Sequence, residues 1–216
     1  MSNQDRLPQL CEAINGMIKS VGGETIVFFS EACRPSFDGG DIKNKLNEMS
    51  WFQMRNYICE KCNLVFLGEC SNNEDVNCMS FGIASFCTTK IVCDIHSVLP
   101  RRILTEGIGS GTVGIKFISG EIVWAIHMPL DFKTEIIENN MAHKAMKGLC
   151  SLMKSYPNSI CAFGDFNIIP GKISDCIMAG CDSDFKFCCE NKLTFFGAYY
   201  DTFIPRNEDN EKWELI

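Results

Sequence analysis

The chain has 216 residues, of which 46% are apolar, and its formal net charge is −7. This length and apolar content suffice for one substantial hydrophobic core, so we expect a single domain over residues 1–216. The acidic balance argues against tight, non-specific binding of polyanions through a broad basic face. It does not exclude a nuclease, because a bound metal ion neutralises phosphate charge locally.

The sequence has no run that approaches the roughly 20 apolar residues of a membrane-spanning helix. The N-terminus lacks the basic-then-apolar pattern of a secretion signal, so we expect an intracellular protein, cytoplasmic or nuclear. In that setting the fourteen cysteines are interpreted as reduced thiols that mostly pack as small hydrophobic residues. A zinc site is the alternative for four of them, although the second pair lacks the Cys-x-x-Cys spacing of a zinc ribbon: Cys59, Cys62, Cys70 and Cys78.

The first predicted elements are a helix and a strand. Residues 5–20 are expected to be helical because their apolar residues recur at helical spacing. After Gly22 and Gly23, the apolar segment from Ile26 onward predicts a strand that ends on the carboxylate of Glu31. Apolar residues at helical spacing in residues 42–49 predict a second helix, which is expected to continue past Trp51.

Five strands are predicted next, over residues 63–67, 81–86, 91–98, 112–118 and 122–126. The last two are expected to form a hairpin closed by Ser119 and Gly120. Four nearby glycines do not spell a phosphate-binding G-x-G-x-x-G motif, and we expect a flexible loop that enters the hairpin: Gly107, Gly109, Gly111 and Gly114. His127 follows the last strand, and Pro129 prevents the strand from continuing.

The C-terminal half is expected to begin with a helix over residues 134–155, which carries an apolar stripe and ends before Pro157. The apolar strand 160–163 follows and leads into Gly164-Asp165-Phe166-Asn167. Asp165 and Asn167 are two residues apart, so their side chains are expected to point the same way. Gly164 allows the backbone to approach closely whatever these side chains hold. A strand that ends in a polar turn is the alternative interpretation of this motif alone.

Three apolar strands therefore each end on a polar group suited to phosphate chemistry: Glu31, His127, and Asp165 with Asn167. Mg²⁺ prefers oxygen ligands and needs only one or two protein carboxylates, which Glu31 is able to supply in part. Taken alone, His127 is better interpreted as a half-buried histidine that caps a strand, and the neighbouring motifs reverse this preference. Of the remaining histidines, His96 is expected to be structural, and His143 is expected to lie exposed on its helix.

These motifs resemble those of the endonuclease/exonuclease/phosphatase superfamily, the DNase I-like enzymes. Ser30-Glu31 matches its metal-binding strand end, residues 126–130 match its histidine motif, and Gly164 to Asn167 match its G-D-x-N motif; the resemblance spans roughly residues 24–204. The sequence departs from the family at both ends. The family begins with a strand that carries an asparagine, whereas Asn15 lies within the first predicted helix. The family's terminal Ser-Asp-His motif is absent from the sequence, although Asp201 offers a late carboxylate.

The resemblance implies an α+β fold, a four-layer α/β/β/α sandwich of the DNase I type in which edge or terminal strands are missing. It also implies a phosphodiester or phosphomonoester hydrolase, foremost of nuclease type, that depends on Mg²⁺, with Mn²⁺ as an alternative. Glu31 would bind the metal, while His127, Asp165 and Asn167 would be catalytic and the substrate would be a phosphate ester such as nucleic acid. The alternative is an inactive descendant that serves as a binding protein. The oligomeric state is open, and exposed sheet edges are candidates for capping by a second chain.

Overall fold

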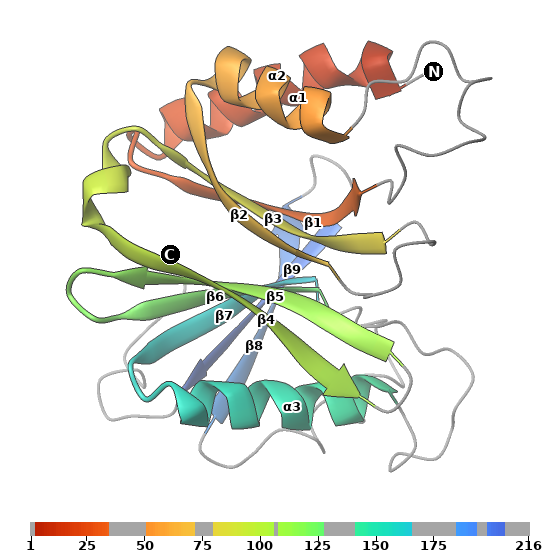
Figure 1. Cartoon of the computed structure of the whole chain (residues 1–216), viewed down its shortest axis with the longest axis vertical. Helices are drawn as coiled ribbons and strands as arrows, with labels where there is room; N and C mark the ends of the chain where they lie inside the picture. Colours follow the sequence, from red (N-terminus) through yellow and green to blue (C-terminus); the bar gives the residue numbers. More distant parts are fainter. Residues whose placement is uncertain are drawn as a thin grey trace.

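The computed structural model describes residues 3–34, 51–71, 80–105, 108–127, 141–165, 185–193 and 198–205 (Figure 1). Three α-helices, a 3₁₀ helix and nine strands are found in these ranges. In chain order they are α1 (Asn3–Ser20), β1 (Ile26–Arg34), α2 (Trp51–Cys62), β2 (Leu64–Ser71), β3 (Ser80–Thr88), η2 (Ile91–Asp94), β4 (Ile95–Thr105), β5 (Ile108–Phe117), β6 (Ile122–His127), α3 (Met141–Ser155), β7 (Ser159–Asp165), β8 (Phe185–Leu193) and β9 (Ala198–Pro205).

The strands form two sheets. The first has the order β1-β3-β2 with antiparallel pairing throughout, and the second has the order β4-β5-β6-β7-β9-β8. Within the described part of the second sheet, β6 and β7 pair in parallel and the other neighbours are antiparallel. A parallel pair requires a crossover connection, and here that connection contains α3.

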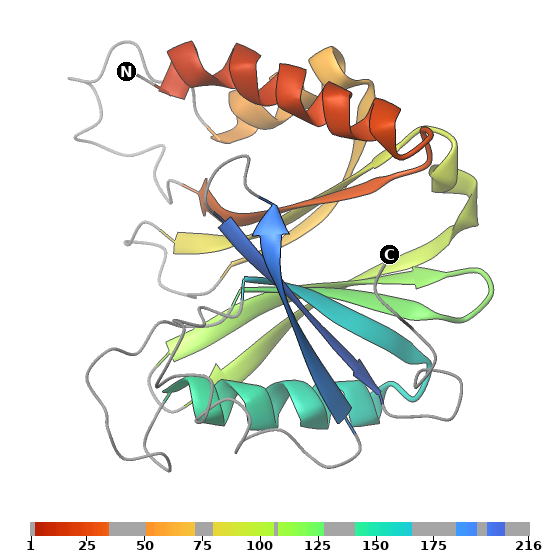
Figure 2. The same cartoon turned by 180° about the vertical axis from the view of Figure 1, so that it is seen from behind.

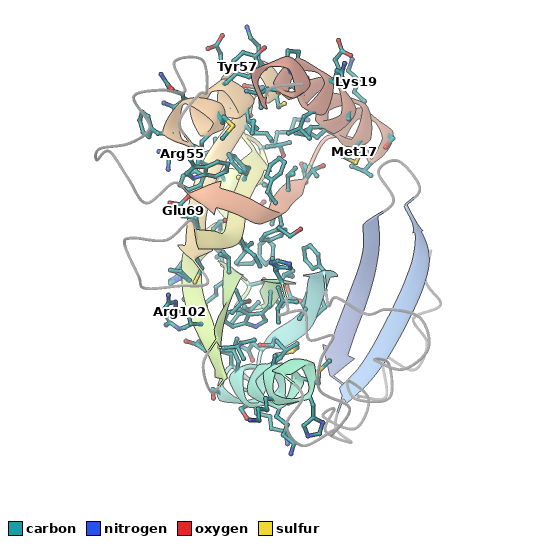
Figure 3. The ribbon with its side chains drawn as sticks, turned by 90° about the vertical axis from the view of Figure 1, so that its right-hand side faces the viewer. Met17, Lys19, Arg55, Tyr57, Glu69 and Arg102 are labelled. Carbon is teal, nitrogen blue, oxygen red and sulfur yellow. The ribbon has the colours of Figure 1, made fainter. Side chains whose placement is uncertain are left out.

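Three hydrophobic clusters separate four layers, which are visible from the side in Figures 1 and 2 and from one end in Figure 3. Helices α1 and α2 cover the outer face of the first sheet, and α3 covers the outer face of the second. The cluster between the sheets includes Ile83, Val113, Ile115 and Ala125. The predicted α/β/β/α sandwich is therefore confirmed. The described part of the chain contains no helix that is long and apolar enough to span a membrane.

Most predicted elements are confirmed within a few residues, including the first helix and the hairpin turn at Ser119 and Gly120. The strand that was predicted to end at Glu31 is present, but it continues to Arg34. The helix predicted over residues 42–49 lies outside the described residues, although α2 does extend from Trp51. Strands β8 and β9 were not predicted. The run that begins at Ile91 was predicted as a strand, but its first four residues form η2, because the chain crosses there from the first sheet to the second.

The prediction of a flexible glycine loop before the hairpin is wrong for the three of its four glycines that the structure describes. Gly109, Gly111 and Gly114 lie within β5 and pair with residues of β4. Gly114 makes room for a large neighbour, because a Cβ atom at this position would fall 2.6 Å from Cζ3 of the Trp124 ring. Glycine is therefore required there for packing between strands rather than for flexibility.

Candidate functional site

His127 is the last residue of β6, and it lies in the layer between the two sheets. Trp124 and Ile126 on the same strand pack against α3, so the alternate residues Ala125 and His127 face the opposite side. His127 is 8% exposed, and its Nδ1 atom is buried. The imidazole is therefore more deeply placed than the half-buried strand cap that the sequence suggested as its alternative role.

Asp165 is the last residue of β7, and its backbone pairs in register with that of His127. One position earlier, Gly164 pairs with Ile126 and has a positive φ of 144°. A Cβ atom at residue 164 would collide with the carbonyl oxygen of Ile126, so only glycine fits. The close approach that the sequence predicted for this glycine is present, but its partner is the backbone of β6.

Glu31 lies near the end of β1, at a β-bulge. Phe29 pairs with Ala84 and Ala32 pairs with Gly82, so Ser30 and Glu31 lie opposite a single residue of β3. Bulges of this kind change the direction of the strand and are frequent beside functional sites. The structure describes the backbone of Glu31.

The ends of β1, β6 and β7 lie at the same end of the molecule (Figures 1 and 2). A direct contact joins the two sheets there: the rings of Phe28 on β1 and Phe163 on β7 meet edge to face, with centroids 4.9 Å apart. Phe28 precedes Glu31 by three residues, and Phe163 precedes Asp165 by two. The backbones of three predicted site residues therefore approach one another, while Asn167 lies outside the described residues.

Asp201 lies on β9, next to the same strand end. Its backbone pairs with Gly164 on one side and with Cys189 of β8 on the other. This position is one residue from Asp165, so the late carboxylate noted in the sequence has its backbone beside the candidate site. This placement depends on the pairing of β9 with β7, a long-range contact that local sequence patterns do not predict.

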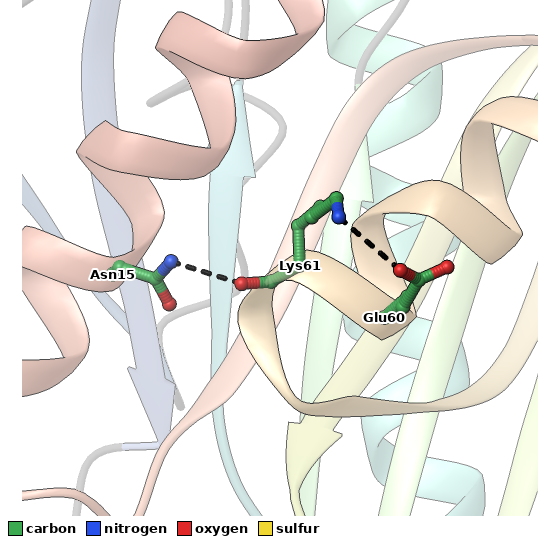
Figure 4. A network of polar contacts seen from close by, with 3 residues as sticks. All are labelled: Asn15, Glu60 and Lys61. Atoms are coloured by element: carbon green, nitrogen blue, oxygen red, sulfur yellow. Dashed lines mark hydrogen bonds and ion pairs between the residues drawn. The ribbon is translucent and has the colours of Figure 1, made fainter.

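Asn15 has a structural role in α1. Its Nδ2 atom donates a hydrogen bond to the carbonyl oxygen of Lys61 in α2, at 3.1 Å, and Lys61 forms an ion pair with Glu60 (Figure 4). This contact joins the two helices over the first sheet. Asn15 therefore does not replace the strand-borne asparagine of the family.

The two other histidines have different surroundings. His96 is exposed near the start of β4, and its Nδ1 lies 3.2 Å from Oγ of Ser97. The prediction that His143 is exposed is wrong, because its exposed fraction is 5%. His143 lies three residues before Met146 and seven before Cys150 in α3, so helical spacing places it on the buried stripe.

The zinc alternative finds no support in the described part of the chain, where no three His, Cys, Asp or Glu side chains form a metal-binding group. The Sγ atom of Cys62 donates to the carbonyl of Cys11 on the outer side of the first sheet. The Sγ atom of Cys70 instead donates to the carbonyl of Arg101, and Cys70 packs in the layer between the sheets. Burial raises the pKa of the Cys62 thiol to about 12, in keeping with its packing among apolar side chains. Cys78 lies outside the described residues.

No family model matches the sequence, and no characterised protein sequence matches it significantly. Solved structures do match. An endonuclease/exonuclease/phosphatase family protein from Leptotrichia buccalis C-1013-b is 9% identical with a TM-score of 0.55, over 93% of this chain and 82% of that one. TDP2 from D. rerio, complexed with single strand DNA product, is 11% identical with a TM-score of 0.51, over 94% and 79%. The chain therefore has the DNase I-like fold of the endonuclease/exonuclease/phosphatase proteins.

Proposed function

We propose that this protein is a metal-dependent phosphoesterase, and specifically a phosphodiesterase of nuclease type. The site lies at the shared end of β1, β6 and β7. The observation that carries this proposal is the register pairing of His127 with Asp165 on adjacent parallel strands. Strand spacing in a sheet is about 4.8 Å, so this pairing places the backbones of a histidine and an aspartate side by side at one strand end. The DNase I-like fold, which TDP2 with its single strand DNA product also has, supports the same class.

Each residue has a proposed role. Glu31 would hold Mg²⁺, because a carboxylate oxygen is the ligand that this ion prefers. When bound, the ion supplies positive charge beside the phosphate. Asp165 accepts a proton from the attacking water, and Asn167 fixes that water or a phosphate oxygen by hydrogen bonding. His127 donates a proton to the leaving oxygen or stabilises the charge that develops on the phosphate.

A binding protein without catalysis is the second candidate, and two observations favour it. The sequence has no Asp-His pair. In addition, His127 is only 8% exposed and lies in the layer between the sheets. For catalysis, the substrate phosphate would have to enter between the strand ends to reach an imidazole at this depth. The binding candidate therefore predicts a folded protein that binds phosphorylated ligands without turnover.

Hydrolysis assays separate the two candidates. The substrates are single-stranded DNA, double-stranded DNA, RNA, an abasic-site duplex and bis-p-nitrophenyl phosphate, each with Mg²⁺, with Mn²⁺ and with EDTA. Asp165→Ala removes the proposed base. Asp94→Ala is the matched control, since Asp94 is an exposed carboxylate in η2, away from the strand ends. The enzyme is supported if turnover requires metal, is lost in Asp165→Ala and is retained in Asp94→Ala. The binding candidate is supported if the folded wild-type protein shows no turnover.

Metal binding has its own test, because catalysis and binding can fail separately. Free Mn²⁺ is measured by electron paramagnetic resonance during titration of the wild-type protein and of Glu31→Gln. We expect Glu31→Gln to bind Mn²⁺ at least about tenfold more weakly, since one charged oxygen ligand is replaced by a neutral amide. Equal binding by the two proteins would remove Glu31 from the metal site.

A further inference from the structure

An exposed aromatic ring is held on the surface of α2 by an arginine. Phe52 and Arg55 lie one helical turn apart, and the guanidinium carbon of Arg55 is 4.9 Å from the ring centroid of Phe52. The same guanidinium carbon also lies over the ring of Phe66 on β2, 4.2 Å from its centroid. Because the guanidinium lies over both rings, the side chains of Phe52, Arg55 and Phe66 form one stack that connects α2 to β2. Phe52 is 60% exposed, so the ring retains a large surface open to a ligand.

This stack lies at the same end of the molecule as the candidate site. Trp51, the first residue of α2, donates its Nε1 proton to Oε2 of Glu69 near the end of β2, at 2.6 Å. Strands β1 and β2 both pair antiparallel with β3, so they run in the same direction and end on the same side. Phe52 therefore lies at the same end of the first sheet as Glu31, which is near the end of β1.

Arginines accompany the ring on this side of the protein. Figure 3 shows Arg55, Glu69 and Arg102 along one side, which is formed by the edge strands β2 and β4. Arg101, the neighbouring residue on β4, points instead to the α3 side of the second sheet, where its Nε atom donates to the hydroxyl of Tyr156 at 2.9 Å. The carboxylate of Glu69 accepts the hydrogen bond from Trp51. Two arginines, Arg55 and Arg102, thus lie along the side that carries the exposed ring, in a chain whose formal net charge is −7.

We propose that this side of the protein binds a single strand of nucleic acid, with one base stacked on Phe52 and a phosphate beside Arg102. Proteins that bind single strands combine aromatic stacking with positive charge along the backbone. A duplex does not offer an open base face to Phe52, and an acidic peptide has no aromatic base to stack. This inference rests on the proposed function and names its substrate class, a polynucleotide strand that reaches the strand-end site from the β2 and β4 side.

Binding is measured with a fluorescently labelled oligothymidine strand by anisotropy, in EDTA so that no hydrolysis occurs. Phe52→Leu keeps an apolar side chain but removes the ring, and we expect it to weaken binding by about 5- to 150-fold, the range for loss of one stacked base. Phe52→Tyr keeps the ring and is expected to bind as tightly as wild type. Ile118→Ala is the matched control, because Ile118 is 67% exposed on the β5–β6 turn, and it is expected to have no effect.

Salt dependence separates stacking from charge. For single strands, the slope of log K against log salt changes by about 0.7 for each phosphate contact. Arg102→Gln is therefore expected to weaken binding and to lower this slope by about 0.7, whereas Phe52→Leu is expected to weaken binding at an unchanged slope. A strand of the same length without bases is expected to bind wild type and Phe52→Leu equally.

Two results would overturn the inference. One is equal affinity of wild type and Phe52→Leu for oligothymidine, with the fold of the variant verified by circular dichroism. The other is binding of poly-glutamate as tightly as oligothymidine at the same charge, which would indicate an acidic protein partner. Neither depends on turnover. Hydrolysis of bis-p-nitrophenyl phosphate by the wild-type protein tests the proposed function alone, because this small substrate has no base to stack on Phe52. Failure of the proposed function and failure of this inference are therefore distinguishable.

Discussion

His127 and Asp165 are register partners at the ends of β6 and β7, the parallel pair in the described part of the second sheet. Parallel strands place their carboxyl ends at one edge, so the pairing brings together two residues that are 38 positions apart, from 127 to 165. The α3 crossover packs against the outer face through Met146 and Leu149, which fixes the position of both strand ends. The relative placement of the two backbones thus depends on sheet pairing and core packing rather than on a surface loop.

Loss of either group is expected to remove most hydrolysis. His127→Gln and Asp165→Asn should each lower kcat/KM for bis-p-nitrophenyl phosphate by at least about 100-fold, the typical contribution of a positioned acid or base. The double variant should be little worse than either single variant, because both groups act on the same step. His96→Gln is the control, since His96 is exposed on β4. Retention of wild-type kcat/KM in a folded His127→Gln variant would show that His127 is a structural residue of the core.

Gly164 is expected to be irreplaceable for stability. Its φ of 144° and the carbonyl oxygen of Ile126 leave no room for a Cβ atom, so Gly164→Ala combines backbone strain with a steric clash. We expect it to lower the free energy of unfolding by at least about 1–3 kcal/mol, measured by urea denaturation. Gly16→Ala is the matched control within α1, where nothing lies near the added methyl group, and it should stabilise the protein by about 0.5–1 kcal/mol. Equal midpoints for Gly164→Ala and wild type would contradict the close approach of β7 to β6.

The sequence predicted the elements that carry the site because their patterns are local. The apolar runs that end at Glu31, His127 and Asp165 are each bounded by a polar residue, and such runs specify strands without reference to the rest of the chain. The pairing order was not accessible in the same way. No local pattern in residues 185–193 or 198–205 predicts that β9 pairs with β7. That pairing is what brings Asp201 next to Gly164.

Burial was the harder property to predict for single polar residues. His143 was expected to lie exposed on its helix, yet the second sheet covers that face of α3. The glycines of β5 were misassigned because the residue that explains Gly114 is Trp124, on the neighbouring strand. In both positions a tertiary contact outweighed the local propensity on which the prediction relied.

Gly114 and Trp124 are expected to be energetically coupled. Gly114→Ala would place a methyl group 2.6 Å from the Trp124 ring, which is fully buried and hydrogen-bonded from Nε1 to Oγ of Ser159. Overpacking of this kind typically lowers the free energy of unfolding by about 1–3 kcal/mol. In a Trp124→Leu background the same substitution should be less damaging, so a double-mutant cycle should give a coupling of about 0.5–3 kcal/mol. Additive effects would show that the ring does not restrict residue 114.

Buried thiols are expected to make the protein sensitive to alkali. Cys87 on β3 is fully buried, and burial raises its pKa from the ordinary value of 9.0 to about 11. Burial also raises the pKa of Cys161 to about 11. Between pH 9 and 11 the unfolded chain releases protons that the folded protein retains, so stability that is complete below pH 9 is lost as the pH rises toward 11.

Cys87→Ala should therefore reduce this pH dependence. Urea denaturation at pH 7, 9, 10 and 11, in a reducing buffer, should show a smaller decline in the free energy of unfolding for Cys87→Ala than for wild type. Ile83→Val is the control, because it lies buried on the same strand and should lower stability by about 0.5–1.5 kcal/mol at every pH without changing the slope. Other groups that titrate in this range are present in all three proteins, so the difference between slopes isolates the Cys87 thiol. Parallel curves for Cys87→Ala and wild type would mean that this thiol ionises equally in the folded and unfolded states.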